Sequence, residues 1–241
     1  MGTWRKKAKE ARLKATRSKT FERARKVLLG TDLVVLGDHE VGKTVIHAFL
    51  REGRLVTDYV ETIGAKKLAR SGKLELGVRV EEEETNSPTG KIRLSKGWDI
   101  GGAMVPNADR WKESVWKADI ILYVFDAVRI TTGDQQHIRL IKDQCATIAT
   151  WISARQKVGI KPPLVAMVGT HCDLIPDFGP VDTKEYADFD RLVSRQISLY
   201  KPRMKLGGVL PCTPPLSYGS LKSIESADEL LARVLFKDLD L

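Results

Sequence analysis

The feature that most constrains the fold of this 241-residue chain is the octapeptide GDHEVGKT at positions 37–44. It follows the apolar run LVVL and precedes the mixed stretch VIHAFLREG, as a loop between a strand and a helix would. Its two glycines permit a backbone in which successive N–H groups point inward around an anion. The following helix would present its positive end to the same anion. The sequence therefore predicts a loop that cradles a nucleotide phosphate chain.

The spacing within this loop assigns roles to its polar residues. Lys43 is expected to place its positive charge on the β and γ phosphates, and Thr44 to ligate Mg²⁺ through its hydroxyl. The other predicted nucleotide-binding residues of the loop are His39, Glu40, Val41, Gly42 and Val45. The competing interpretation is a glycine-containing turn with an exposed lysine, which the flanking strand and helix patterns disfavour.

Strand patterns alternate with helix patterns along the rest of the chain. Strands are expected at 32–37, 73–84, 91–100, 119–127, 163–169 and 207–212, and helices at 43–53, 107–118, 134–156, 183–200 and from Ser226 onward. The segments 73–84 and 91–100 are expected to pair as a hairpin, and Ser226 with Glu229 fits a capping box. This alternation predicts an α/β fold with a mostly parallel sheet that helices cover on both faces.

Parallel sheets bind ligands at the carboxyl ends of their strands, so the residues that follow each strand are candidates for a site. Asp99 and Gly102 lie at the end of the strand predicted at 91–100 and form a DxxG pattern. A carboxylate at this place can hold a Mg²⁺-bound water. The Gly102 N–H can touch a γ phosphate and respond to its loss.

The stretch THCDL follows the strand predicted at 163–169 and supplies four candidate base-binding residues, Thr170, His171, Asp173 and Leu174. The Asp173 carboxylate can accept hydrogen bonds from both N1–H and the 2-amino group of guanine, whereas adenine would leave it unsatisfied. The alternative interpretation is an aspartate that caps a helix. The loop over the far side of the base is expected to consist of Cys212, Thr213 and Pro214.

The order of these motifs resembles that of the Ras-like small GTPases, and most closely that of the Arf branch. Residues 98–102 match the WDxGG of that branch, and residues 62–64 match the TIG of its first switch. The resemblance covers about residues 31–238. It implies a three-layer G domain with a six-stranded, mostly parallel sheet.

The resemblance also implies an activity. The chain would bind GTP and GDP with Mg²⁺ and hydrolyse GTP. The segments 57–64 and 99–110 would change with the bound nucleotide and signal to effector and regulatory proteins, and pairing of two copies as a homodimer is left open. The residues implied are Thr44, Thr62 and Asp99 for the metal, and Lys43, Thr62 and Gly102 for catalysis.

Four features depart from the family pattern, the fourth being a longer hairpin between Thr62 and Asp99, which lie 37 residues apart. Ala103 stands where the family has the glutamine that orients the attacking water, and alanine cannot hydrogen-bond a water, so slow hydrolysis is expected. His39 and Glu40 are alternative water-positioning groups, although loop side chains that point to solvent are the favoured interpretation. His171 stands where the base motif has lysine, and its imidazole could stack on the purine instead.

The net charge of +9 is confined to the N-terminal segment. Residues 1–26 hold eleven of the 40 basic residues and two of the 31 acidic ones, so the remainder carries 29 of each sign. We therefore expect a basic N-terminal extension at 1–30 and a G domain at 31–241. Three interpretations of the extension stay open: a solvated tail, a segment that binds an anionic membrane surface, and a segment that binds RNA.

Composition bears on the compartment. No apolar stretch reaches 18 residues, so no membrane-spanning helix is expected. The three cysteines include no CxxC pair and indicate a cytoplasmic protein, with peripheral membrane binding through the extension as an addition. The predicted function is a guanine-nucleotide switch with slow hydrolysis. The alternatives are a GTP-binding assembly module without hydrolysis, a ribosome- or RNA-associated GTPase, and an ATP-using enzyme.

Overall fold

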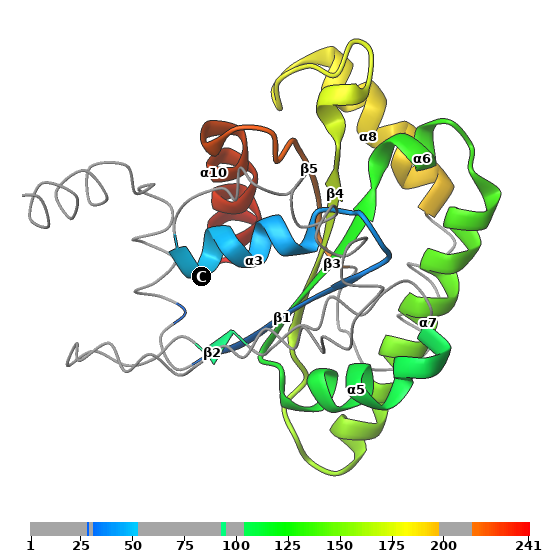
Figure 1. Ribbon diagram of the computed structural model, residues 1–241, viewed down its shortest axis with the longest axis vertical. Coiled ribbons are helices and arrows are strands. Elements are labelled where there is room, and N and C mark those ends of the chain that lie inside the picture. The colour runs from blue at the N-terminus through cyan, green and yellow to red at the C-terminus, as the bar shows by residue number, and fades with distance from the viewer. Residues whose placement is uncertain (1–27, 29–30, 53–92, 95–103, 198–213) are drawn as a thin grey trace, which may run out of the picture.

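Figure 1 shows a computed structural model of the protein, which describes residue 28 and residues 31–52, 93–94, 104–197 and 214–241. The strands predicted at 73–84 and 207–212 lie outside these ranges. So does the predicted basic extension, apart from Leu28, which is buried in the core.

The sheet is built from parallel strands. The described part of the chain contains β1 (Asp32–Gly37), β2 (Arg93–Leu94), β3 (Ile120–Asp126), β4 (Leu164–Thr170) and β5 (Leu216–Tyr218). Their order is β2-β1-β3-β4-β5, and every neighbouring pair is parallel. The predicted α/β fold with a parallel sheet is confirmed, although the described residues supply five strands and not the predicted six.

Helices connect these strands. Those described are α3 (Lys43–Glu52), α5 (Met104–Lys117), α6 (Ala127–Thr131), α7 (Gln135–Lys157), α8 (Lys184–Ile197) and α10 (Ile224–Ala232), with a 3₁₀ turn η2 (Cys172–Leu174) and a π turn η3 (Arg233–Asp238). The helices predicted at 43–53, 107–118, 134–156 and 183–200 are confirmed to within a few residues. Within the described ranges, none of the helices has the length and apolar character needed to cross a membrane.

One described helix was not predicted, and another is capped differently from the prediction. The short helix α6 was not expected, and Asp126 caps it by accepting the backbone N–H groups of Val128 and Arg129. Helix α10 begins at Ile224, earlier than predicted. Ser223 and Ser226 each accept the other's backbone N–H at 3.2 Å. The predicted capping box of Ser226 with Glu229 is therefore wrong, because Ser223 is the cap and Ser226 its partner three residues on.

The sheet is the middle one of three layers (Figure 1). Successive side chains of a strand point to opposite faces, so Leu33 and Val35 pack on one side of β1, and Val34 and Leu36 on the other. The first face is covered by α3 and α10 through Ile46, Phe49, Leu230 and Leu231. The second face is covered by α5, α7 and α8 through Trp111, Val115, Ile141, Ile148 and Val193. Burial of each such side chain contributes roughly 1.5–3 kcal/mol.

The parallel arrangement brings the carboxyl ends of β1, β3, β4 and β5 to one edge of the sheet. The chain continues from β1 to a strand on one side of it and reaches β3 on the other side. This change of direction makes the end of β1 a topological switch point, where open α/β sheets bind their ligands.

Candidate functional site

The loop predicted to cradle phosphate leaves the sheet at this switch point, between β1 and α3. Gly37 has a φ of 144°, and a Cβ there would lie 2.0 Å from the carbonyl oxygen of Val124 in β3. Gly42 has a φ of 87°, and a Cβ there would lie 2.6 Å from Cδ1 of Leu221. Both positions require glycine, because any side chain would clash and strain the backbone. The predicted strand, loop and helix are all present.

The side chain of Lys43 folds back over this loop. It is 5% exposed, and its Nζ donates a hydrogen bond to the backbone carbonyl of Asp38. The ammonium group therefore lies against the loop and away from bulk solvent. This burial contradicts the competing interpretation of a turn with an exposed lysine.

The other predicted loop residues differ in what they can offer a ligand. His39 and Glu40 are exposed, and Glu40 has a left-handed φ of 58°. The Val41 side chain is buried in the core on the α3 side of the sheet, so only its backbone can face a ligand. Thr44 and Val45 are partly buried in the first turn of α3.

Thr170, at the end of β4, joins the base-binding motif to the loop. It is fully buried, and its hydroxyl lies 2.9 Å from the carbonyl oxygen of Val41 and 3.1 Å from that of Phe125. The hydroxyl therefore holds the loop against β3 and β4. Although predicted to bind nucleotide, Thr170 supports the loop from beneath and does not present its side chain to a ligand.

His171 follows with a left-handed backbone, at φ 61° and ψ 22°. Its Nδ1 lies 3.2 Å from Oδ2 of Asp126, the last residue of β3. The hydrogen bond with Asp126 raises the pKa of His171, against the opposite effect of its partial burial. Burial works against ionisation of Asp126, but His171 and the backbone N–H groups of α6 hold the pKa of Asp126 below its ordinary value.

Asp173 lies exposed in η2, as does Leu174 beside it. An oxygen of Asp173 accepts a hydrogen bond from Oγ of Ser220 at 2.8 Å. That Oγ also accepts the backbone N–H of Lys222, at 3.0 Å. The Ser220 hydroxyl therefore orients one oxygen of the Asp173 carboxylate, and the exposed side chain stays accessible to a ligand. The geometry does not match the helix-capping alternative, because no hydrogen bond of this carboxylate to a helix N-terminus is present among those described for it.

The loop that meets Asp173 follows β5 and differs from the one predicted. The backbone N–H of Cys172 donates to Gly219, and that of Gly219 donates to Gly169, which ties the segment after β5 to the end of β4. Leu221 of the same segment packs on Gly42. Of the residues predicted for this role, Pro214 is buried before β5 begins, and Cys212 and Thr213 lie outside the described residues. The three-residue strand β5 is too short to leave a clear alternating pattern.

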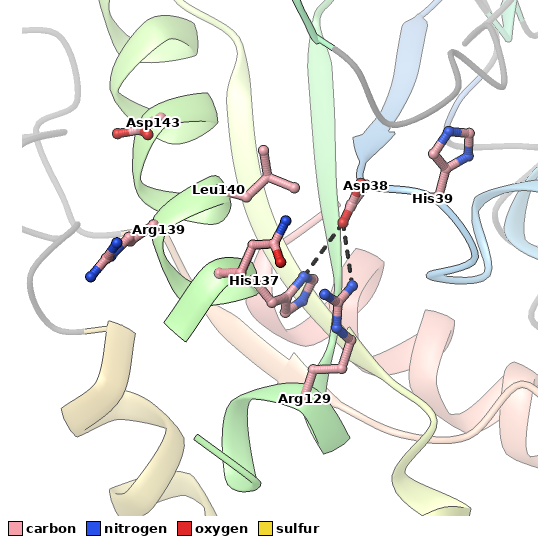
Figure 2. Close-up of a pocket in the computed structure, with 8 residues that line it drawn as sticks. Asp38, His39, Arg129, His137, Arg139, Leu140 and Asp143 are labelled. Atoms are coloured by element: carbon pink, nitrogen blue, oxygen red, sulfur yellow. Dashed lines mark hydrogen bonds and ion pairs between the residues drawn. The ribbon is translucent and has the colours of Figure 1, made fainter. Parts of the chain in front are cut away.

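A polar cluster beside the loop was not predicted at all (Figure 2). Oδ2 of the buried Asp38 lies 3.4 Å from Nη1 of Arg129 and 3.6 Å from Nδ1 of His137. Burial alone would raise the pKa of Asp38, but His137, the His39 backbone N–H and Arg129 keep it lower than usual. A cavity of about 400 Å³ opens here, lined by Asp38, His39, Arg129, Gln136, His137, Arg139, Leu140 and Asp143.

The predicted metal site is described only in part. Thr44 is at the start of α3, whereas Thr62 and Asp99 lie outside the described residues, as do Gly102 and Ala103. Within the described ranges, no group of three His, Cys, Asp or Glu side chains could hold a metal ion. A single hydroxyl beside a phosphate loop fits Mg²⁺, which keeps most of its ligands as phosphate oxygens and waters.

Comparison with known proteins finds similar solved structures but no match to a protein family or to a curated protein. No protein-family model matches the sequence, and no curated protein matches it. Among solved structures, the chain is similar to an ADP-ribosylation-factor-like GTP-binding protein from Encephalitozoon cuniculi, also described as the small COPII coat GTPase SAR1, in complex with GDP. The identity is 18%, the match covers 99% of this chain and 90% of that one, and the TM-score is 0.51. At this identity the likeness shows the fold, which is the three-layer α/β fold of a GTPase G domain.

Proposed function

We propose that the protein binds GTP and GDP with Mg²⁺ and acts as a molecular switch that hydrolyses GTP slowly. One observation carries the proposal: the loop 37–44 and the turn 170–173 lie at one edge of the sheet, joined by the hydroxyl of Thr170. These two segments were assigned to the two ends of one nucleotide from their sequences alone. The Encephalitozoon protein of the same fold was crystallised with GDP, which agrees with this proposal.

The phosphate end would be bound by backbone amides and by Lys43. The loop amides and the positive end of α3 attract an anion, and the buried ammonium group would move from the Asp38 carbonyl to the β and γ phosphates. Mg²⁺, held by Thr44 together with Thr62 and Asp99, would neutralise charge on the same phosphates.

The base end would be selected by Asp173. Its carboxylate, oriented by Ser220, would accept from the two adjacent donors of guanine. Adenine has no such pair of donors and would leave a carboxylate unsatisfied, which disfavours the alternative of an ATP-using enzyme.

Slow hydrolysis is proposed because the side chain of Ala103 cannot form a hydrogen bond to the attacking water. The same residue supports the second candidate function, a GTP-binding assembly module that has lost hydrolysis. The Ala103→Gln variant separates the two candidates. A rise in phosphate release would mean that only the water-positioning group is missing, whereas no phosphate release from either protein would favour the assembly module.

The main experiment identifies the nucleotide that copurifies with the full chain and then measures affinities for GDP, GTP and ATP. The proposal expects tight GDP and GTP binding, and a Lys43→Ala variant that binds both far more weakly. Lys117→Ala is a matched control, because Lys117 lies exposed on α5 and pairs with Glu113 at the surface. Equal affinities for GTP and ATP, or unchanged GTP affinity of Lys43→Ala, would overturn the proposal.

The basic extension is proposed to bind an anionic partner outside the G domain of residues 31–241. A membrane surface and RNA are both consistent with eleven basic residues in 1–26. Either partner is consistent with a cytoplasmic protein that associates with membranes or with ribosomes. Liposome and RNA pulldowns with and without residues 1–26 distinguish the two, and equal recovery of the truncated protein in both assays would exclude them.

A further inference from the structure

The start of α7 buries a histidine beside the phosphate loop. The His137 side chain is 0% exposed, and its Nε2 accepts the backbone N–H of Asp126 at 3.3 Å. A neutral imidazole carries one proton, so an acceptor at Nε2 assigns that proton to Nδ1. His137 is therefore a buried donor at Nδ1, and its ring is held in one orientation by the end of β3.

The Nδ1–H of His137 is aimed at the phosphate loop. Nδ1 makes no hydrogen bond within the part of the chain that the structure describes, and the Asp38 carboxylate faces it at 3.6 Å. In Figure 2, Asp38 points from the loop toward His137 and Arg129, whereas His39 turns away from them. The first side chain of the loop thus faces α6 and α7.

A second connection runs through Arg129. Its Nη1 lies 3.4 Å from Oδ2 of Asp38, and its Nε donates to Asp134 at 2.8 Å. Asp134 caps α7 by accepting the backbone N–H of His137 at 3.0 Å. The guanidinium group therefore binds, and the imidazole faces, the same carboxylate oxygen from two adjacent elements.

We propose that His137 is a positioning residue for the phosphate loop, acting through the Asp38 carboxylate on the nucleotide that the proposed function places there. The backbone carbonyl of Asp38 accepts the Lys43 ammonium. Fixing the Asp38 side chain therefore fixes the peptide against which Lys43 rests. The inference depends on the proposed function, because it concerns how the same loop is held.

Nucleotide binding and the His137 contact should strengthen each other. Phosphate groups that order the loop would bring the Asp38 oxygen within hydrogen-bond distance of Nδ1, and a buried donor gains an acceptor when that happens. Coupling of this kind is reciprocal, so a hydrogen bond that forms on GDP binding must raise the affinity for GDP.

Two substitutions of His137 test the contributions of its two ring nitrogens separately. His137→Gln puts an amide oxygen near the place of Nε2 and keeps an acceptor for the Asp126 N–H, but it removes the donor to Asp38. His137→Asn puts an amide nitrogen near the place of Nδ1 and keeps that donor, but it removes the acceptor. We expect GDP to dissociate about tenfold faster from His137→Gln, as for loss of one hydrogen bond to a charged group, and about as fast from His137→Asn as from wild type.

Thermal unfolding in the absence of nucleotide measures the contribution of His137 to fold stability, separately from its effect on GDP dissociation. Both variants should lose stability, because each leaves one buried polar group unpaired. Arg139→Ala, on the exposed side of the same cavity, is the matched control and should change neither quantity. Equal GDP dissociation rates for wild type and His137→Gln would reduce His137 to a structural residue and overturn the inference.

Wild-type protein provides a test that needs no variant. With ¹⁵N-labelled histidine, NMR should show His137 as the Nδ1–H tautomer, with its proton resonance moving downfield when GDP is added. An Nε2–H tautomer, or a resonance that stays in place while GDP binds, would overturn the inference and leave the proposed function intact. Failure of wild-type protein to bind GDP at all would overturn both.

Discussion

His171 and Asp126 form a contact where β3 and β4 end, with Nδ1 and Oδ2 3.2 Å apart. The charges that act on this imidazole are carboxylates on three segments: Asp126 at the end of β3, Asp173 in η2, and Glu40 in the loop 37–44. All three favour the protonated ring. The folded chain therefore binds a proton at His171 more tightly than the unfolded chain does, where the pKa is near 6.5.

The first prediction is a stability that falls as pH rises through the titration of His171. Because its pKa is raised on folding, the stabilisation is fully present below the unfolded pKa and is lost as pH rises through the folded pKa. The free energy of unfolding should thus decrease between about pH 6 and about pH 8, and less so in His171→Gln. Urea denaturation at both pH values measures it.

Titration of the Asp126 carboxylate does not contribute to the change in stability between about pH 6 and about pH 8. Its pKa is lowered on folding, so its own contribution is present above its unfolded value of 3.8 and is lost only as pH falls through the folded pKa. Parallel curves for wild type and His171→Gln between the two pH values would contradict the prediction.

The second prediction concerns the base. In Asp173→Asn an amide replaces the carboxylate, so one of the two acceptors for guanine is lost and a donor takes its place. GDP should bind more weakly by about 3 kcal/mol, or about a hundredfold. Xanthosine diphosphate, which has a carbonyl where guanine has its 2-amino group, should bind the variant better than it binds wild type. Competition binding measures both.

Asp182→Asn serves as the control for this substitution, because Asp182 is an exposed carboxylate between η2 and α8. Unchanged GDP affinity in Asp173→Asn would show that this carboxylate does not read the base.

At the scale of elements, helix α10 depends on its cap. Its buried face of Ala227, Leu230 and Leu231 packs on the sheet, and the reciprocal hydrogen bonds of Ser223 and Ser226 hold its first turn. The loop 37–44 rests against the segment just before α10, through Gly42 and Leu221. The start of α10 is therefore joined to the candidate site.

The third prediction tests this cap. Ser223→Ala removes the acceptor for the Ser226 N–H and should lower the free energy of unfolding by about 1 kcal/mol. Ser226→Ala removes the acceptor for the Ser223 N–H and the hydroxyl that donates to the Ser223 carbonyl, neither of which serves an N–H of the helix itself, and should cost less. Chemical denaturation of the two variants gives the comparison, and a larger loss for Ser226→Ala would contradict the assignment of Ser223 as the cap.

At the scale of the whole molecule, the candidate site is held together by contacts between elements. The loop contacts β3 through Gly37, β4 through Thr170, and the segment after β5 through Leu221. A ligand that bridges these elements binds the folded chain alone, so it must stabilise the fold as a whole.

The fourth prediction is a rise in melting temperature with GDP. At a hundred times its Kd, GDP should add about 2.7 kcal/mol, which for a chain of this size is roughly 5–10 °C. ATP at the same concentration should have little effect, and the shift should shrink in Lys43→Ala. Calorimetry measures the shift, and an equal shift with ATP would indicate a site that does not select its base.

The local patterns of the sequence determined the loop 37–44 between a strand and a helix, its two required glycines and the alternation of strands with helices. These features depend on residues close together in the chain: the spacing of GDHEVGKT and the periodicity of apolar side chains. The same patterns placed α3, α5, α7 and α8 to within a few residues.

Only the tertiary structure decided which distant residues support that loop. Ser226 was misread as a cap because serine suits several positions in a first turn. Asp126, His137 and Ser220 belong to segments whose sequences contain no recognisable motif for this role. These residues meet because the strand order brings the carboxyl ends of β1, β3, β4 and β5 to one edge. The pairing of an imidazole with a carboxylate 99 residues away is set by that order, which leaves no mark in local periodicity.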